Sequence, residues 1–236
     1  MTAIDITFDV FSDTPKGKDP DSYSPMLRNY HKMLWSKPLP CGKNFSLDLD
    51  SPRLLHHKSD LGEFFLSSDA ITHSYHGVKK MSHIVDAIPS QEIGSFYDND
   101  NTIGSYIIFP SKRIDNKMTI NGSRGTNRKI MDRFDLSLEC IRRFYLKKAS
   151  PLSETLERYS SYFALFGDFR GYVDFFLLQD LVADDSRTIN FYLPFDNFSR
   201  SPLPETTHEY RAYRGNTLAF VDGRSERIRN YGDSLT

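Results

Sequence analysis

The chain is poor in the residues that mark several specialised protein classes. It has only two cysteines, Cys41 and Cys140, which lie far apart in its 236 residues. That number and separation exclude a disulfide framework and the paired-cysteine spacing of a zinc knuckle. No run reaches the roughly 18 apolar residues of a membrane-spanning helix. Asp5 and Asp9 stand where a secretory signal carries basic and apolar residues, so we expect a cytoplasmic protein with no membrane partner.

An excess of one charge is also lacking. Thirty Lys and Arg residues face thirty-one Asp and Glu residues, which gives a formal net charge of -1. This balance excludes a histone-like cationic protein and an acidic tail protein. The motifs GxGxxG, HExxH, GxSxG and the Walker loop are all absent. The sequence therefore identifies no reaction and no cofactor.

Aromatic residues, in contrast, are abundant. Eighteen Phe and thirteen Tyr bring the aromatic share to 14%, within a total of 39% hydrophobic residues. Such rings can fill a core that has little Val and Ile. The chain is also long enough to bury a sizeable core. We therefore expect a folded protein and a single domain spanning residues 1–236.

Hydrophobic periodicity predicts four strands. Apolar and polar residues alternate over 4–11 and 45–49, and β-branched and aromatic residues gather at 103–109 and 189–193. Residues 54–68 fit either a strand or a helix, because Gly62 interrupts an apolar run. Residues 90–101 are polar and predict a surface loop.

Helical spacing predicts five helices, and they set the fold class. Ser24-Pro25 is a typical helix start and opens a helix that ends at Trp35. Three helices then follow in succession over 128–148, 150–166 and 169–182, and a last one covers 207–229. Because the helices do not alternate with strands, the pattern favours an α+β fold over a doubly wound sheet. We expect a mixed or antiparallel sheet, a central cluster of three helices and a C-terminal helix.

Four segments carry a resemblance to a known family. They are Ser12–Asp19 (SDTPKGKD), Tyr30–Pro40 (YHKMLWSKPLP), Leu61–Asp69 (LGEFFLSSD) and Phe169–Val182 (FRGYVDFFLLQDLV). The chain resembles an uncharacterised bacterial family, a domain of unknown function that spans essentially the whole chain. The resemblance implies a bacterial cytoplasmic protein and supplies no activity and no site residues.

The strongest local charge lies between Lys112 and Ala149, where eleven basic residues face four acidic ones. Within it, a glycine-containing basic loop runs towards a predicted helix. Free amides at a helix start and Arg side chains can together bind phosphate. The residues of this predicted phosphate site are Gly122, Arg124, Gly125, Arg128, Lys129 and Arg133. We expect a nucleotide or nucleic acid as partner, and the alternative is a solvated basic helix face.

Histidines are concentrated in one short region. Imidazole and carboxylate groups together suit zinc, manganese or iron. The candidate ligands are His56, His57, Asp60, His73 and His76. Their spacing matches no known metal signature, so the alternative is a set of solvated or hydrogen-bonded histidines. A metal-dependent hydrolase that uses these residues is one alternative to the phosphate-binding function. A non-catalytic protein-interaction module is the other.

Two further groups of charged residues have structural and functional interpretations. Asp13, Asp19 and Asp21 follow the first predicted strand and could act as an acid–base pair or bind a divalent ion. Asp is also an ordinary turn former. Asp174 punctuates an apolar segment, and we expect it to pair with Arg170 four residues earlier.

Overall fold

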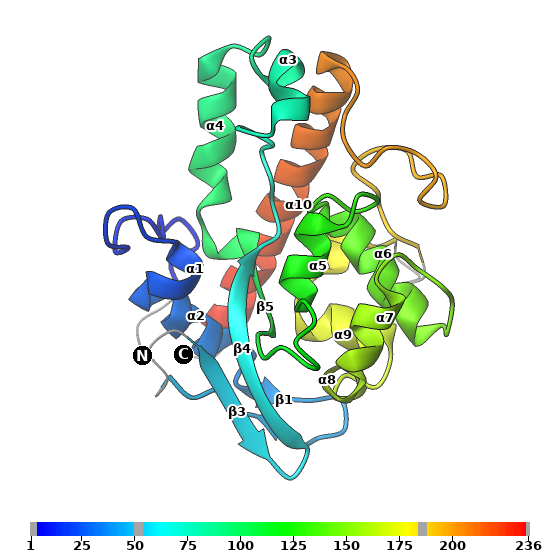
Figure 1. The fold of residues 1–236 in the computed structure, drawn as a ribbon. Coiled ribbons are helices and arrows are strands. Elements are labelled where there is room, and N and C mark those ends of the chain that lie inside the picture. The colour runs from blue at the N-terminus through cyan, green and yellow to red at the C-terminus, as the bar shows by residue number, and fades with distance from the viewer. Residues whose placement is uncertain (1–3, 50–53, 184–187, 235–236) are drawn as a thin grey trace.

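Helices and two small antiparallel sheets make up the computed structural model, which describes residues 4–49, 54–183 and 188–234 (Figure 1). The helices described are α1 (Pro20–Tyr23), α2 (Pro25–Trp35), α3 (Ser82–Val85), α4 (Ser90–Asp100), α5 (Ile120–Thr126), α6 (Phe134–Tyr145), α7 (Ser153–Arg158), α8 (Ser160–Ala164), α9 (Phe169–Phe175) and α10 (Thr207–Asp233). The strands described are β1 (Lys37–Pro38), β2 (Asn44–Phe45), β3 (Leu55–Ser59), β4 (Gly62–Ala70) and β5 (Tyr106–Pro110). The predicted α+β class and the C-terminal helix are confirmed.

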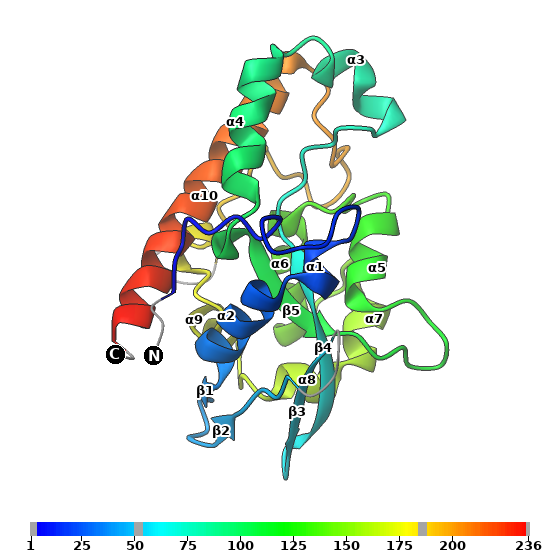
Figure 2. The same ribbon diagram turned by 90° about the vertical axis from the view of Figure 1, so that its left-hand side faces the viewer.

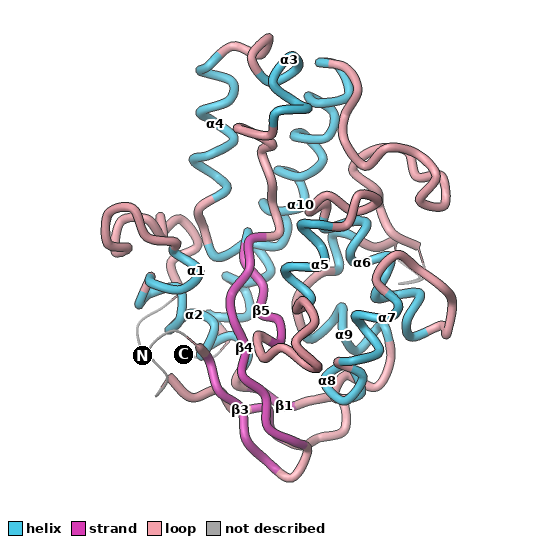
Figure 3. The backbone as a smooth tube through the Cα atoms, viewed as in Figure 1, coloured by secondary structure: helices cyan, strands magenta, loops and turns pink. Residues whose placement is uncertain are grey.

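The larger sheet has the order β3-β4-β5, and both pairs are antiparallel. Leu66 of the central strand lies opposite Leu55 on one side and Pro110 on the other. The segment that the sequence left undecided is therefore a hairpin. Gly62 begins its second strand with φ +137°, a value that residues with a side chain rarely adopt. The strands occupy one part of the molecule and helices surround them (Figure 3).

Strand β4 lies between two groups of helices. Helices α1 and α2 are on one side and α5 is on the other (Figures 1 and 2). The long helix α10 runs past the sheet, where it contacts α2, α4 and the 3₁₀ turn Ile103–Ser105. Side chains from α1, β4 and α5 can therefore meet around β4.

Helix α2 begins and ends as the sequence predicts. The Ser24 hydroxyl accepts a hydrogen bond from the Leu27 amide at 3.0 Å, and Pro25 takes the first helical position. Asp13 accepts from the Ser24 hydroxyl at 2.6 Å and from the Met26 amide at 2.8 Å. Part of the charged loop before α2 therefore has a structural role at this helix start.

Aromatic rings fill much of the core, as the composition predicts. Phe176 lies 5.2 Å from Trp35, 5.2 Å from Phe166 and 4.9 Å from Tyr172, measured between ring centroids. All four side chains are buried. Tilted and edge-to-face pairs of this kind add about 0.5–1.5 kcal/mol each beyond their buried area.

The prediction of a strand at residues 4–11 is wrong, because the structure has turns there. Asp5 accepts hydrogen bonds from the amide and the hydroxyl of Thr7, at 2.9 and 2.7 Å, and Asp9 accepts from the Phe11 amide at 2.9 Å. Such local bonds give the backbone an alternative to a sheet ladder. The strand expected at 189–193 is reduced to an isolated bridge between Val182 and Ile189.

The three central helices are shorter than predicted. The first begins at Phe134 because Met131 and Asp132 have φ values of +45° and +64°, which no right-handed helix allows. The second is divided into α7 and α8, and the third ends at Phe175. The loop expected at 90–101 is helix α4, whose Ile93 and Phe96 are spaced to face α10. Packing against a distant helix thus overrides a polar composition.

Gly171 lets helix α9 pack closely against its surroundings. A Cβ at this position would collide with the carbonyl oxygen of Phe166 and would lie 3.1 Å from Pro40. Gly215 on α10 is the opposite case, because a Cβ there would meet no atom within 4 Å.

We expect Gly171→Ala to lower the free energy of unfolding by about 1–3 kcal/mol, because the backbone around Phe166 has to shift. Gly215→Ala is the matched control and should raise it by up to about 1 kcal/mol through helix propensity. Urea unfolding of both variants measures the two effects. Equal stabilities would contradict the close approach at Gly171.

Candidate functional site

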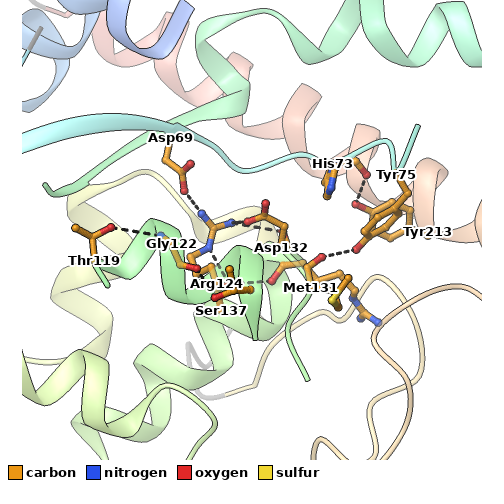
Figure 4. A network of polar contacts seen from close by, with 12 residues as sticks. Asp69, His73, Tyr75, Thr119, Gly122, Arg124, Met131, Asp132, Ser137 and Tyr213 are labelled. Atoms are coloured by element: carbon orange, nitrogen blue, oxygen red, sulfur yellow. Dashed lines mark hydrogen bonds and ion pairs between the residues drawn. The ribbon is translucent and has the colours of Figure 1, made fainter. Parts of the chain in front are cut away.

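Arg124, the central residue of the predicted phosphate site, is buried and already neutralised. Its guanidinium contacts the Asp69 carboxylate directly, lies 3.5 Å from Asp132 and donates to the Ser137 hydroxyl at 2.9 Å (Figure 4). These partners come from β4, from the turn before α6 and from α6 itself. Arg124 therefore joins three parts of the chain and has no exposed face for an oxyanion.

Arg133 is committed in the same way. Its Nε donates to Asp135 at 3.0 Å, and one Nη donates to the carbonyl of Pro202 at 3.1 Å. Asp135 also accepts from the Tyr192 amide at 2.9 Å. The buried ion pair of Arg133 and Asp135 therefore connects the start of α6 with the segment that precedes α10.

The other residues of the predicted phosphate site do not assemble around a ligand either. The Gly122 amide donates to Thr119, which caps α5, and Gly125 lies within the same helix. Arg128 and Lys129 are exposed on the following turn. The structure therefore corrects the expected loop of free amides and guanidiniums: the segment is a helix whose arginine points inwards to carboxylates.

Carboxylates from distant segments gather around Arg124. Burial, and to a smaller extent the nearby carboxylates of Asp132, Asp21 and Asp19, raise the pKa of Asp69 against the attraction of Arg124. Burial and the Asp19 carboxylate raise the pKa of Asp21 to about 7. The cluster thus brings Asp19 and Asp21 of the charged N-terminal loop close to Arg124 of the predicted phosphate site.

A hydrogen-bonded chain runs from this cluster into the core. The Trp35 indole donates to Nδ1 of His31 at 2.9 Å, and Nε2 of His31 lies 2.9 Å from the Ser68 hydroxyl, which in turn bonds to Asp21. Burial and Arg224 lower the pKa of His31 to about 3, so its imidazole is neutral. Since Nδ1 accepts, Nε2 carries the proton and donates to Ser68. His31 therefore cannot act as the base that activates a Ser68 nucleophile.

The predicted metal ligands are dispersed. His56 pairs with Glu63 at 2.9 Å, and His57 bonds to the Ser46 carbonyl at 2.8 Å. Asp60 pairs with Lys43 in the hairpin turn region. The His73 ring lies 4.6 Å from the ring of Tyr75, and His76 is exposed. In the part of the chain that the structure describes, no three His, Cys, Asp or Glu residues are arranged to hold a metal ion.

An open depression of about 540 Å³ lies where β1, α9 and the end of α10 meet. Lys37 lies in it, with its Nζ 5.0 Å from the Trp35 ring, 4.7 Å from Phe175 and 4.6 Å from Tyr231. No carboxylate among the described residues lies within salt-bridge distance of this ammonium. The other lining residues include Pro38, Leu39, Pro40, Asp168, Arg170 and Asp174.

Arg224 lies near this depression and has no anionic partner among the described residues. It is fully buried, and its guanidinium donates only to carbonyls, those of Gly104 at 2.6 Å, Tyr106 at 2.8 Å and Phe176 at 3.2 Å. One Nη has no hydrogen-bond partner among the described residues. Burial lowers the pKa of Arg224 to about 9.

The environment of Lys37 favours its neutral amine. Burial and the charge of Arg224 lower the pKa of Lys37 to about 7, against a smaller opposite effect of Asp174. The three ring faces attract the ammonium and oppose this lowering. An amine with a shifted pKa in a depression is a candidate for function. A buried charge that is paired with carboxylates, such as Arg124, is structural.

Comparison with known proteins gives a family without an activity. The model of a family of unknown function, DUF6994, matches residues 4–228. The chain belongs to this family. Searches of curated proteins and of solved structures found no match. Among the described residues, no helix combines the length and the apolar composition needed to cross a bilayer.

Little in the sequence of this DUF6994 member predicts the depression. Lys37 stands between Trp35 and the Pro38–Pro40 turn, so its local setting is apolar. The other two rings of its surroundings come from α9 and α10, far along the chain. The predicted pair of Arg170 and Asp174 is present at 3.6 Å and lies at the edge of the depression.

Replacing Arg124 should show that its role is structural. We expect Arg124→Met to lower the free energy of unfolding by about 3–5 kcal/mol, because Asp69 and Asp132 would lose their partner in a largely buried place. The control Arg128→Met removes an exposed charge from the same segment and should change it by less than about 0.5 kcal/mol. Urea unfolding of both variants decides, and equal losses would contradict the clamp.

Asp21 should make stability depend on pH. Its folded pKa of about 7 exceeds its ordinary value of 3.8, so its contribution is fully present below pH 4 and is lost as the pH rises to 7. The stability of Asp21→Asn relative to the natural protein should therefore rise between pH 4 and 7, by up to about 4 kcal/mol, and the difference should stay constant at higher pH. Asp19→Asn, which keeps a capping oxygen but removes the charge that helps to raise this pKa, should give a smaller gain over the same pH range. A gap that is the same at every pH would contradict the raised pKa.

Proposed function

We propose that this protein is an enzyme that acts on small aldehydes or ketones through the amine of Lys37. The observation that carries the proposal is the setting of that amine. It lies in an open depression, beside three aromatic rings and near the unpaired charge of Arg224. A desolvated lysine next to a second cation is a recognised way to obtain a nucleophilic amine at neutral pH.

The chemistry follows from the protonation state. With a pKa of about 7, a large fraction of Lys37 is neutral at physiological pH, and only the neutral amine attacks a carbonyl carbon. The Nζ–C bond forms, the carbonyl oxygen leaves as water, and an imine remains. Asp168 and Asp174 line the same depression and are the carboxylates available to accept and return the protons of these steps.

The walls favour a small and partly apolar substrate. Pro38, Leu39 and Pro40 form one side, and Phe175 lies close to the amine. Arg170 is exposed at the edge, and its pairing distance of 3.6 Å to Asp174 leaves it able to turn towards a polar group of a ligand.

Nucleotide or nucleic-acid binding at the basic segment stays a prediction that no contact in the structure supports. Two of its three arginines, Arg124 and Arg133, are buried in ion pairs. A hydrolytic metal site at the dispersed histidines has no supporting geometry among the described residues either.

Reductive trapping tests the proposed amine. The protein is incubated with butanal or acetone and sodium cyanoborohydride at pH 7, and modified lysines are located by peptide mass spectrometry. We expect Lys37 to be alkylated at least about tenfold faster than the exposed Lys58, because an ordinary lysine is almost wholly protonated at this pH.

The pH profile gives the second readout. The rate at Lys37 should level off above pH 7 to 8, whereas the rate at Lys58 should keep rising towards pH 10. Lys37→Met removes the modified peptide signal and serves as the control for assignment. Equal rates at the two lysines, or parallel pH profiles, would overturn the proposal.

A further inference from the structure

The charge of Arg224 is buried without an anionic partner among the described residues, and the amine chemistry of Lys37 does not explain this. A guanidinium that is fully buried ordinarily has an anionic partner, since desolvating an unpaired charge is costly. Among the described residues, Arg224 donates hydrogen bonds to three neutral carbonyls, and one Nη has no partner. The positive charge of Arg224 can therefore stabilise a nearby negative charge that the described part of the chain does not supply.

Lys37 is a group near Arg224 whose charge a chemical reaction can reverse. Both side chains lie against the same indole, with Nζ of Lys37 at 5.0 Å and Cζ of Arg224 at 5.8 Å from the Trp35 ring. As an ammonium, Lys37 is repelled by Arg224. If Lys37 carried a negative charge, the same interaction would become attractive.

We propose that Lys37 reacts reversibly with carbon dioxide to form a carbamate, and that Arg224 stabilises the negative charge of this adduct. The proposal rests on the proposed function in one respect, because both need a neutral and accessible amine at Lys37. It adds a different reagent and a product of opposite charge.

The reaction balances without an oxidant or a cofactor. The nitrogen lone pair of the neutral amine forms a bond to the carbon of CO₂, and one carbon–oxygen π pair becomes the charge of the new carboxylate. One N–H proton leaves to water or to a neighbouring carboxylate. Carbon dioxide is small and uncharged, so the apolar wall of Pro38, Leu39 and Pro40 does not hinder its entry.

The charged groups around the depression set the balance of the reaction. Arg224 of α10 and Arg170 of α9 favour an anion on Lys37, whereas Asp168 and Asp174 at the start and within α9 oppose it. Arg224 is buried and Asp174 is half-exposed, so solvent screens the opposing charge more strongly. A carbamate would also block imine formation, so carbon dioxide would inhibit the carbonyl chemistry of the same lysine.

Chemical trapping of the carbamate tests this inference. The full-length protein is equilibrated with ¹³C-labelled bicarbonate and carbon dioxide at pH 7.5 and alkylated with triethyloxonium, which converts a carbamate into a stable ethyl ester. Peptide mass spectrometry then locates the label. We expect labelled ester at Lys37, at least about tenfold more than at Lys58, and none at that position in Lys37→Met.

Two exposed substitutions test the electrostatic argument without disturbing the core. Asp174→Asn removes an opposing charge and should raise the trapped fraction about twofold, and Arg170→Gln should lower it by a similar factor. Circular dichroism shows that both variants are folded. Opposite changes support the proposal, and unchanged fractions overturn the role given to the surrounding charges.

Cyanoborohydride trapping on the same preparations separates the two proposals. Alkylation of Lys37 by butanal without any carbamate overturns the inference and leaves the proposed function in place. Carbamate without alkylation overturns the proposed function alone. If neither reagent modifies Lys37, both fall, and equal carbamate at all lysines overturns the claim of a specific site.

Discussion

The buried guanidinium of Arg224 is the interaction on which the arrangement around the depression depends. It donates hydrogen bonds to carbonyls of the turn before β5, of β5 itself and of the end of α9, and these bonds connect the three elements to α10. Its Cζ also lies 5.8 Å from the centre of the Trp35 ring, whose indole donates to His31. The same charge contributes to the lowered pKa of Lys37, which lies beside that ring.

Arg124, Arg133 and Arg224 are all buried but differ in the partners of their charge, and this difference separates a structural role from a functional one. Arg124 and Arg133 have carboxylate partners, so they act as clamps between segments. Arg224 has carbonyl dipoles alone among its described partners, so it imposes a positive potential on its surroundings. A group that titrates in such a potential, as Lys37 does, is displaced towards its less positive form.

Local signals predicted the elements whose ends are set by neighbouring residues. Ser24-Pro25 begins α2 and Asp168 caps α9, because capping needs only side chains within one turn. The prediction of an N-terminal strand is wrong because of another local interaction. Asp5 accepts a hydrogen bond from the Thr7 amide, which a strand would use to pair with its neighbour. Helix α4 was missed because its stability comes from α10, which the polar sequence of 90–101 does not reveal.

The basic segment shows why charge counting from sequence cannot locate a ligand site. Its excess of positive charge is real, but Arg124 meets Asp69, which lies on β4 far earlier in the chain, and the fold removes the charge from the surface. Lys37 shows the converse. It stands in a segment with no notable charge, and its reactivity comes from Arg224, Phe175 and Tyr231, which only the folded chain brings to it. In both cases the outcome depends on whether the folded chain places a group of opposite charge beside the charged side chain. That placement is made by contacts between residues distant in sequence.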